Sequence, residues 1–199
     1  MGIVLLYYIT IYVLEKEKTK NVVLLHGVGL LTGFGWLTIC LIKEITMPIA
    51  LWILTMCILW ALSVLTVIDC KRHQIPNDFL KLLLGIWGIV MIFDIIIQER
   101  DGLELLFMSL VGAFIGGGIF LLCYMISGKR LGAGDVKLVF LLGLFLTEQK
   151  IIEVIFYSTL LSLLFCLLQL YVRKMDKRKE FPMTPFFYLG TWIAFFTLY

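Results

Sequence analysis

The stretch LLFMSLVGAFIGGGIFLLCYMIS, residues 105–127, contains no charged residue, and its apolar residues run on without alternating with polar ones. About 20 apolar residues in an α-helix cross the hydrocarbon layer of a bilayer, which is ~30 Å thick. Only helices and closed barrels satisfy their backbone in lipid, and barrel strands would alternate. The stretch therefore predicts a membrane-spanning helix. Its small residues at 112–113 and 116–118 would let a neighbouring helix approach closely.

The whole chain has the composition of a membrane protein. Of its 199 residues, 61% are hydrophobic and only 16% are charged, and the mean hydropathy is +1.02. Soluble domains are about 45–50% apolar and about 25% charged. The net charge of +3 is too small to indicate a nucleic-acid partner. The sequence therefore predicts an all-α, polytopic helix bundle that is solvated by a lipid bilayer.

Charged clusters divide the chain into apolar segments, from which we expect about eight spans, with six as the lower bound. The segments are 2–14, 21–42, 46–68, 79–97, 105–127, 136–147, 151–172 and 183–198. The first and the sixth are short for a span. We expect the first to be retained, because no basic region precedes it and no small-residue cleavage site follows it.

Lysines and arginines are distributed unequally between the two sides of this arrangement. All but three of the 17 fall in or beside the connections that follow odd-numbered segments, the exceptions being Lys43, Arg100 and Lys150. Basic residues accumulate in cytoplasmic loops. We therefore expect these connections to be cytoplasmic.

The cysteines do not indicate a metal site. All five lie singly, without a C-x-x-C pair, and four of them are inside apolar segments. A thiol in such a place behaves as a small hydrophobe, whereas a metal site needs clustered ligands. We expect neither a metal nor another cofactor.

Ionisable residues at membrane depth are costly and are functional candidates for that reason. Asp94 and Glu153 lie near the outer ends of their segments, which is typical of a solvated helix end. His26 is more typical of a hydrogen-bonded packing residue. Asp69 and Asp135 differ, because two crossings separate them and return the chain to the same face. They could therefore meet at one depth.

Two carboxyl groups that meet in this way can perform hydrolysis. Carboxylates about 3 Å apart cannot both ionise at neutral pH, so they share a proton. One of them can then activate water as a base while the other protonates a carbonyl oxygen. Taken singly, either Asp69 or Asp135 could also be an interfacial helix cap. The pair together favours an aspartyl protease site.

The residues around the two acids support a site. Gly132 and Gly134 directly precede Asp135, and glycine allows another chain to approach the backbone closely. Pro76 follows the loop after Asp69 and is typical of a helix start.

Three motifs resemble the type IV prepilin peptidases, which are GxGD membrane aspartyl proteases. Residues 132–138 read G-A-G-D-V-K-L, the family's G-x-G-D signature, and residues 69–77 read D-C-K-R-H-Q-I-P-N, similar to its other aspartate element. Residues 181–186, F-P-M-T-P-F, resemble its closing motif, with Thr184 where glycine is usual. The resemblance covers roughly residues 46–199 as a peptidase core, and residues 1–45 would be N-terminal spans.

The resemblance implies that Asp69 and Asp135 are the catalytic dyad, with Gly132, Gly134, Pro76, Asn77 and Lys137 shaping the site. Lys137 could equally be an ordinary cytoplasmic cation. The family removes a short basic leader from pilin-like precursors at the cytoplasmic face of the bacterial inner (plasma) membrane, cutting just before a hydrophobic helix, and serves type IV pili and protein secretion. Its larger members carry a tetracysteine domain linked to N-methylation. Residues 15–20 form the whole corresponding loop and hold no cysteine, so we expect a short form without methyltransferase activity.

Two other functions remain open from the sequence. A proton-coupled transporter could relay protons through the two aspartates, although such acids usually lie near the midplane between repeated halves. A non-catalytic assembly protein for pili or secretion could have inherited the peptidase scaffold with both acids in place.

Overall fold

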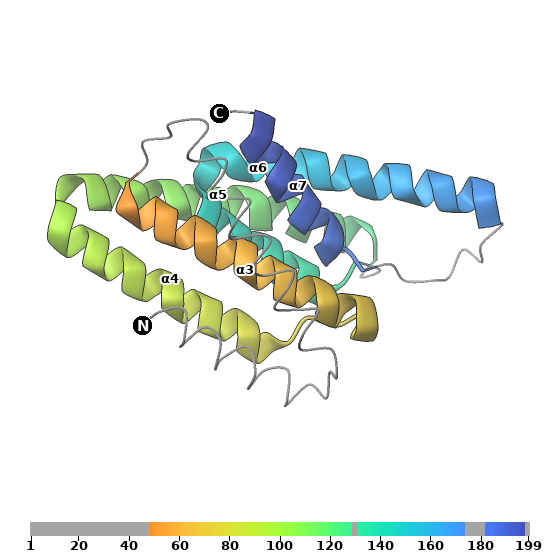
Figure 1. Cartoon of the computed structure of the whole chain (residues 1–199), viewed down its shortest axis with the longest axis horizontal. Helices are drawn as coiled ribbons and strands as arrows, with labels where there is room; N and C mark the ends of the chain where they lie inside the picture. Colours follow the sequence, from red (N-terminus) through yellow and green to blue (C-terminus); the bar gives the residue numbers. More distant parts are fainter. Residues whose placement is uncertain (1–47, 129–130, 174–181, 198–199) are drawn as a thin grey trace.

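The computed structural model describes residues 48–128, 131–173 and 182–197, and all secondary structure in this part is helical. The helices, shown in Figure 1, are α3 (Ile49–Arg72), α4 (Asn77–Gln98), α5 (Arg100–Ile126), α6 (Ala133–Arg173) and α7 (Thr184–Thr197). The expected segments 2–14 and 21–42, and His26 with them, lie outside the described residues. The all-helical class is confirmed for the described part.

In the part of the chain that the structure describes, fewer helices are long enough to span a membrane than expected. Four of the described helices, α3 to α6, are long and apolar enough to cross a membrane, and α7 has only 14 residues. At 1.5 Å per residue α7 is about 21 Å long, which is short of the hydrocarbon thickness. The expected segments 136–147 and 151–172 are the two arms of one element, α6, which meet at the non-helical residue Thr147. The structure thus shows an integral membrane protein, but the prediction of about eight spans is not supported.

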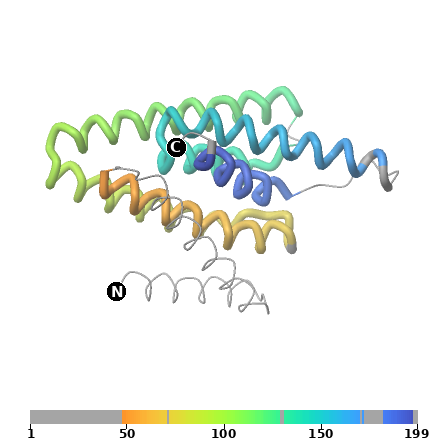
Figure 2. The backbone as a smooth tube through the Cα atoms, turned by 45° about the horizontal axis from the view of Figure 1, so that its top comes forward, coloured from red at the N-terminus to blue at the C-terminus, as the bar shows by residue number. Residues whose placement is uncertain are grey.

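Helix α6 folds back on itself at Thr147. This residue has φ 66° and ψ 176°, which is not a helical conformation. A Cβ atom at Gly116 of α5 would lie 2.8 Å from the side chain of Ile151 and 3.2 Å from that of Val139. In one straight helix those two residues would be about 18 Å apart. Both arms of α6 therefore pack against α5, as the tube in Figure 2 shows.

The contact between α5 and α6 brings backbone against backbone. A Cβ atom at Gly112 would lie 2.7 Å from the carbonyl oxygen of Gly143, and a Cβ atom at Gly143 would overlap the carbonyl group of Gly112. Such close approach is what small residues provide between membrane helices, where lipid supplies no hydrophobic drive for association. Gly112, Gly116 and Gly117 therefore have the packing role that the sequence predicts, whereas a Cβ atom at Gly118 would meet nothing within 4 Å.

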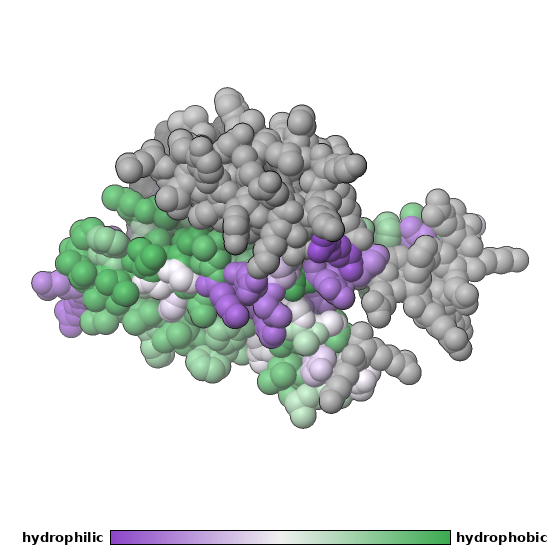
Figure 3. Space-filling view, turned by 90° about the horizontal axis from the view of Figure 1, so that it is seen from below, coloured by the Kyte–Doolittle hydropathy of each residue, from purple (hydrophilic) through white to green (hydrophobic). Residues whose placement is uncertain are grey.

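Helix α3 forms the centre of the bundle, whereas α4 and the second arm of α6 expose apolar side chains. Leu54 and Leu62 of α3 are fully buried, while Phe93 of α4 and Leu168 of α6 are 62% and 63% exposed. Hydrophobic residues cover much of the described surface in Figure 3, and hydrophilic ones gather toward the middle and right of that view. Exposed apolar surface of this extent fits contact with lipid.

The order of the helices places several helix ends together. Helix α4 runs back along α3 after the loop 73–76, and α5 runs back along α4 after the single residue Glu99 (Figure 1). Consequently α3 and α5 end, and α4, α6 and α7 begin, at one end of the bundle (Figure 2). Helix N-termini carry partial positive charge. This end of the molecule is therefore suited to negatively charged side chains.

Candidate active site

Asp69 is held in the last turn of α3 by the start of α7. Its side chain is buried, with 5% of the residue exposed. The backbone N–H of Thr184, the first residue of α7, donates a hydrogen bond of 3.1 Å to Oδ2 of Asp69. A backbone donor at a helix N-terminus favours negative charge on its acceptor. The fold thus supplies a buried carboxylate with a dedicated partner.

Asp135 lies in the first turn of α6 and is partly buried. Its own N–H donates to the carbonyl oxygen of Gly132 at 3.1 Å, which closes the turn before the helix. A Cβ atom at Gly132 would lie 2.8 Å from Oδ2 of Asp135, and one at Gly134 would lie 3.2 Å from Cβ of Ile75. The two glycines therefore leave room for the carboxyl group and for the neighbouring loop.

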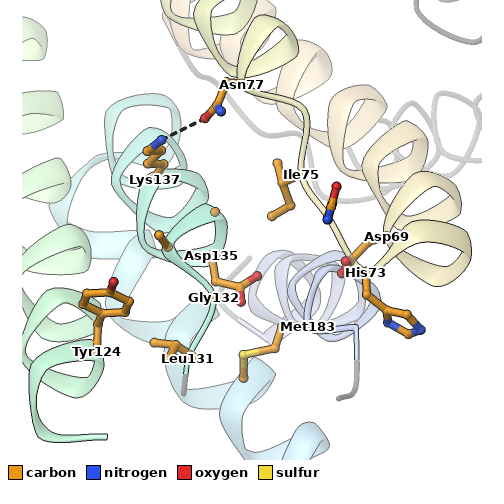
Figure 4. Close-up of a pocket in the computed structure, with 13 residues that line it drawn as sticks. Asp69, His73, Ile75, Asn77, Tyr124, Leu131, Gly132, Asp135, Lys137 and Met183 are labelled. Atoms are coloured by element: carbon orange, nitrogen blue, oxygen red, sulfur yellow. Dashed lines mark hydrogen bonds between the residues drawn. The ribbon is translucent and has the colours of Figure 1, made fainter. Parts of the chain in front are cut away.

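Both aspartates line one pocket of about 570 Å³ at the end of the bundle. In Figure 4 their carboxyl groups point into the same space from opposite walls, Asp69 from α3 and Asp135 from α6. A cavity of this size is in the usual range for ligand sites. The pocket is lined by Asp69, His73, Gln74, Ile75, Asn77, Tyr124, Leu131, Gly132, Ala133, Gly134, Asp135, Lys137 and Met183.

A polar bridge joins two walls of the pocket. The ammonium group of Lys137 donates a hydrogen bond of 2.8 Å to Oδ1 of Asn77, and both side chains are exposed (Figure 4). The bridge connects the first turn of α6 to the first residue of α4. Pro76 lies directly before α4 with φ −66° and ψ 123°, at the helix start that its sequence position predicts, but it does not line the pocket.

Sequence reasoning missed the contribution of α7 and α5 to this pocket. The amide of Thr184 is a backbone group, so no side-chain pattern could show it, and the motif at 181–186 was used only as part of the resemblance to the family. Met183 precedes α7 and Tyr124 is near the end of α5, and both line the pocket. Neither has a charge, and although Met183 lies within the motif at 181–186, an apolar side chain there gave no indication of a role in the site.

Asp94 and Glu153, the other ionisable candidates among the described residues, do not line this pocket. Asp94 is buried, with 6% exposed, and accepts a hydrogen bond of 2.8 Å from Nε2 of Gln98. The expectation of a solvated helix end is therefore wrong for Asp94, because a neighbouring amide satisfies its carboxylate inside the bundle. Glu153 lies 3.7 Å from the ammonium group of Lys150.

Known proteins match the part of the chain that builds this pocket. Residues 56–167, more than half of the chain, match the model of the type IV leader peptidase family. The chain belongs to this family. The matched range includes both aspartates and ends before α7.

Curated proteins that match the chain share its family but are longer. The prepilin leader peptidase/N-methyltransferase of Aeromonas salmonicida is 28% identical over 140 residues, which are 68% of this chain and 46% of that protein. The protein of the same name from Pseudomonas aeruginosa is 26% identical over 136 residues, again 68% and 46% of the two chains. This family member therefore spans about half the length of the curated relatives it matches. No solved structure matches the chain.

Proposed function

We propose that this leader peptidase family member is a membrane aspartyl endopeptidase that removes the short leader of pilin-like precursors, with Asp69 and Asp135 as its catalytic pair. The observation that carries the proposal is the pocket in which the two carboxyl groups face each other at the meeting point of five helix ends. The family to which the chain belongs supports peptide hydrolysis, and the names of the relatives support the substrate class.

The surroundings of the two acids suggest different roles for them. Asp69 accepts the Thr184 amide at the N-terminus of α7, so it is the better holder of the negative charge. Asp69 is then the base and Asp135 the acid. A water between them loses a proton to Asp69 as its oxygen attacks the peptide carbonyl carbon, while Asp135 gives its proton to the carbonyl oxygen.

The second half of the reaction restores both groups. Asp69 passes its proton to the peptide nitrogen, and the C–N bond breaks. Asp135 regains a proton from the tetrahedral intermediate as the carbonyl of the new carboxyl group forms. Gly132 leaves the Asp135 carboxyl free to move through these states, since a Cβ atom there would press on it.

The charge pattern of the sequence supports a cytoplasmic location for the pocket in the inner membrane of a bacterium. The loop after α3 and the start of α6 belong to connections that hold most of the lysines and arginines. Arg72, Lys81 and Lys137 are exposed near the pocket end of their helices. A precursor with its leader in the cytosol would present the scissile bond on this side.

Replacement of each acid tests the proposal against its rivals. Asp69→Asn and Asp135→Asn are co-expressed with a precursor that has a basic leader, a glycine and an apolar helix, and the product mass is measured. Either change should abolish cleavage while the protein remains in the membrane. The same mass would show whether a methyl group is added, which we expect not to happen.

Asp94→Asn is the matched control, because Asp94 is an equally buried aspartate with a hydrogen-bond partner, away from the pocket. It should cleave as the parent does. A pilus or secretion role that persists in both pocket variants would indicate a non-catalytic scaffold, and loss of solute flux without a processing defect would indicate a transporter. Asp69 and Asp135 lie near helix ends rather than at mid-span, which favours the peptidase over the transporter.

A further inference from the structure

A second, apolar groove of about 740 Å³ runs beside the candidate active site. It lies between α4, α5 and α6, three helices long and apolar enough to cross a membrane. Its walls are mainly large hydrophobic side chains, including Leu80, Leu84, Phe114, Leu121, Phe140 and Leu141. Phe114 is 71% exposed and Leu121 49% exposed. The groove is therefore an open apolar surface at the depth of the membrane.

The groove adjoins the pocket of the two aspartates. Asn77 and Lys137 line both cavities, and the hydrogen bond between their side chains marks the boundary. The pocket side of this boundary is polar and contains Asp69 and Asp135. An extended chain that places a bond at the acids and continues past the bridge must enter the groove.

One glycine in the lining of the groove has empty space where a side chain would be. Gly118 of α5 lines the groove, and a Cβ atom there would meet nothing within 4 Å. Its neighbour Gly117 is already packed, since a Cβ atom would lie 2.8 Å from the ring of Phe140. A helix with its side chains is about 10–12 Å across, and a glycine on one wall lets a second helix lie close. Gly118 therefore leaves room for an incoming helix to lie close to α5.

We propose that this groove receives the membrane-embedded apolar segment of the same polypeptide whose bond is cut in the pocket, an inference that rests on the proposed function. The groove would then select substrates that continue as an apolar helix on one side of the cleaved bond. A charged leader would not occupy it, because burying unpaired charge among apolar side chains is costly. The leader lies on the polar side of the Lys137–Asn77 bridge.

Gly118→Leu tests the groove by filling it. The added side chain projects into open space, so it leaves the packing of α5 on α6 unchanged. Cleavage of a membrane-embedded precursor should fall roughly tenfold or more, since binding energy from a remote segment of the substrate is lost. Gly85→Leu is the matched control: a Cβ atom at Gly85 also meets nothing within 4 Å, and Gly85 does not line the groove. It should cleave normally, and a groove variant that cleaves as well as this control would overturn the proposal.

Cross-linking separates the groove from the chemistry. A photo-reactive residue in place of Phe114, a groove residue that is already large and exposed, in an Asp69→Asn background, should capture the uncleaved precursor through its apolar segment. Capture of lipid alone, or of a part of the precursor other than its apolar segment, would overturn the groove proposal. If cleavage requires the two aspartates but the cross-link does not form, the groove proposal is refuted and the proposed peptidase function stands. If cleavage persists in Asp69→Asn, the proposed peptidase function is refuted, whether or not the cross-link forms.

Discussion

Replacement of Thr184 by proline should remove the backbone N–H that donates to Asp69 and should change little else in the structure. Thr184 is the first residue of α7, a position where proline is well tolerated because its φ suits the start of a helix. Proline has no N–H, so the 3.1 Å hydrogen bond to Asp69 Oδ2 would be lost. The proline ring is close to threonine in size, which matters because Thr184 is fully buried.

The size of the effect follows from the charge on the acceptor. A hydrogen bond to a charged group contributes about 1.5–3 kcal/mol, and each ~1.4 kcal/mol is a factor of ten in rate. If Asp69 carries the charge of the pair, cleavage by Thr184→Pro should be about 10- to 150-fold slower. The fall should appear in kcat with KM nearly unchanged, because the lost interaction acts on the base rather than on substrate binding.

Cleavage of a precursor in membranes, followed by mass measurement of the product over time, provides the assay. Thr184→Ala is the matched control, since it keeps the amide and removes a hydroxyl that has no hydrogen-bond partner among the described residues. It should stay within about threefold of the parent, because the amide hydrogen bond is intact. Equal rates for the proline and alanine variants, at equal membrane levels, would refute the role of the α7 amide.

Two further changes probe the glycines. Gly132→Ala should slow cleavage about 100-fold with little change in the amount of protein in the membrane, because its Cβ atom would displace the Asp135 carboxyl group by up to about 1 Å. Gly134→Ala should slow cleavage less, because its Cβ atom would meet only the aliphatic side chain of Ile75. Equal effects of the two changes in a cleavage assay would contradict this reasoning. Gly143→Ala should destabilise the protein by about 1–3 kcal/mol, since its Cβ atom would overlap the backbone of Gly112, and an unchanged thermal midpoint in detergent would count against that contact.

The sequence was sufficient to predict that the protein is a helical membrane protein and that Asp69 and Asp135 lie close together. Continuous apolar runs determine the class, and the number of crossings between Asp69 and Asp135 determines that both reach one face. The number of spans was harder to predict, because charge clusters mark chain breaks without showing whether each segment crosses. Thr147 illustrates this: α6 folds back there, directly before the charged residues that end the expected segment 136–147.

Other features could not be read from residue types. Asp94 looked like a solvated helix end, but its exposure depends on how α4 packs, and Gln98 four residues later satisfies it within the bundle. The partner of Asp69 is a backbone amide from a helix 115 positions away along the chain. Long-range contacts of this kind depend on how α7 docks, which composition and periodicity do not specify. The resemblance at 181–186 supported the family but did not place this segment at the site.

The backbone contact between Gly112 and Gly143 also affects which of the helices around the groove can move. At this contact no side chain lies between α5 and α6, so no rotamer change there could absorb sliding of one helix over the other. We therefore expect the two helices to move together, as one plate that carries Asp135. Helix α4 is tied to this plate at the pocket end by the exposed Lys137–Asn77 hydrogen bond, worth about 1 kcal/mol. We therefore expect the groove to widen for a substrate helix by a movement of α4 about its junction with α5.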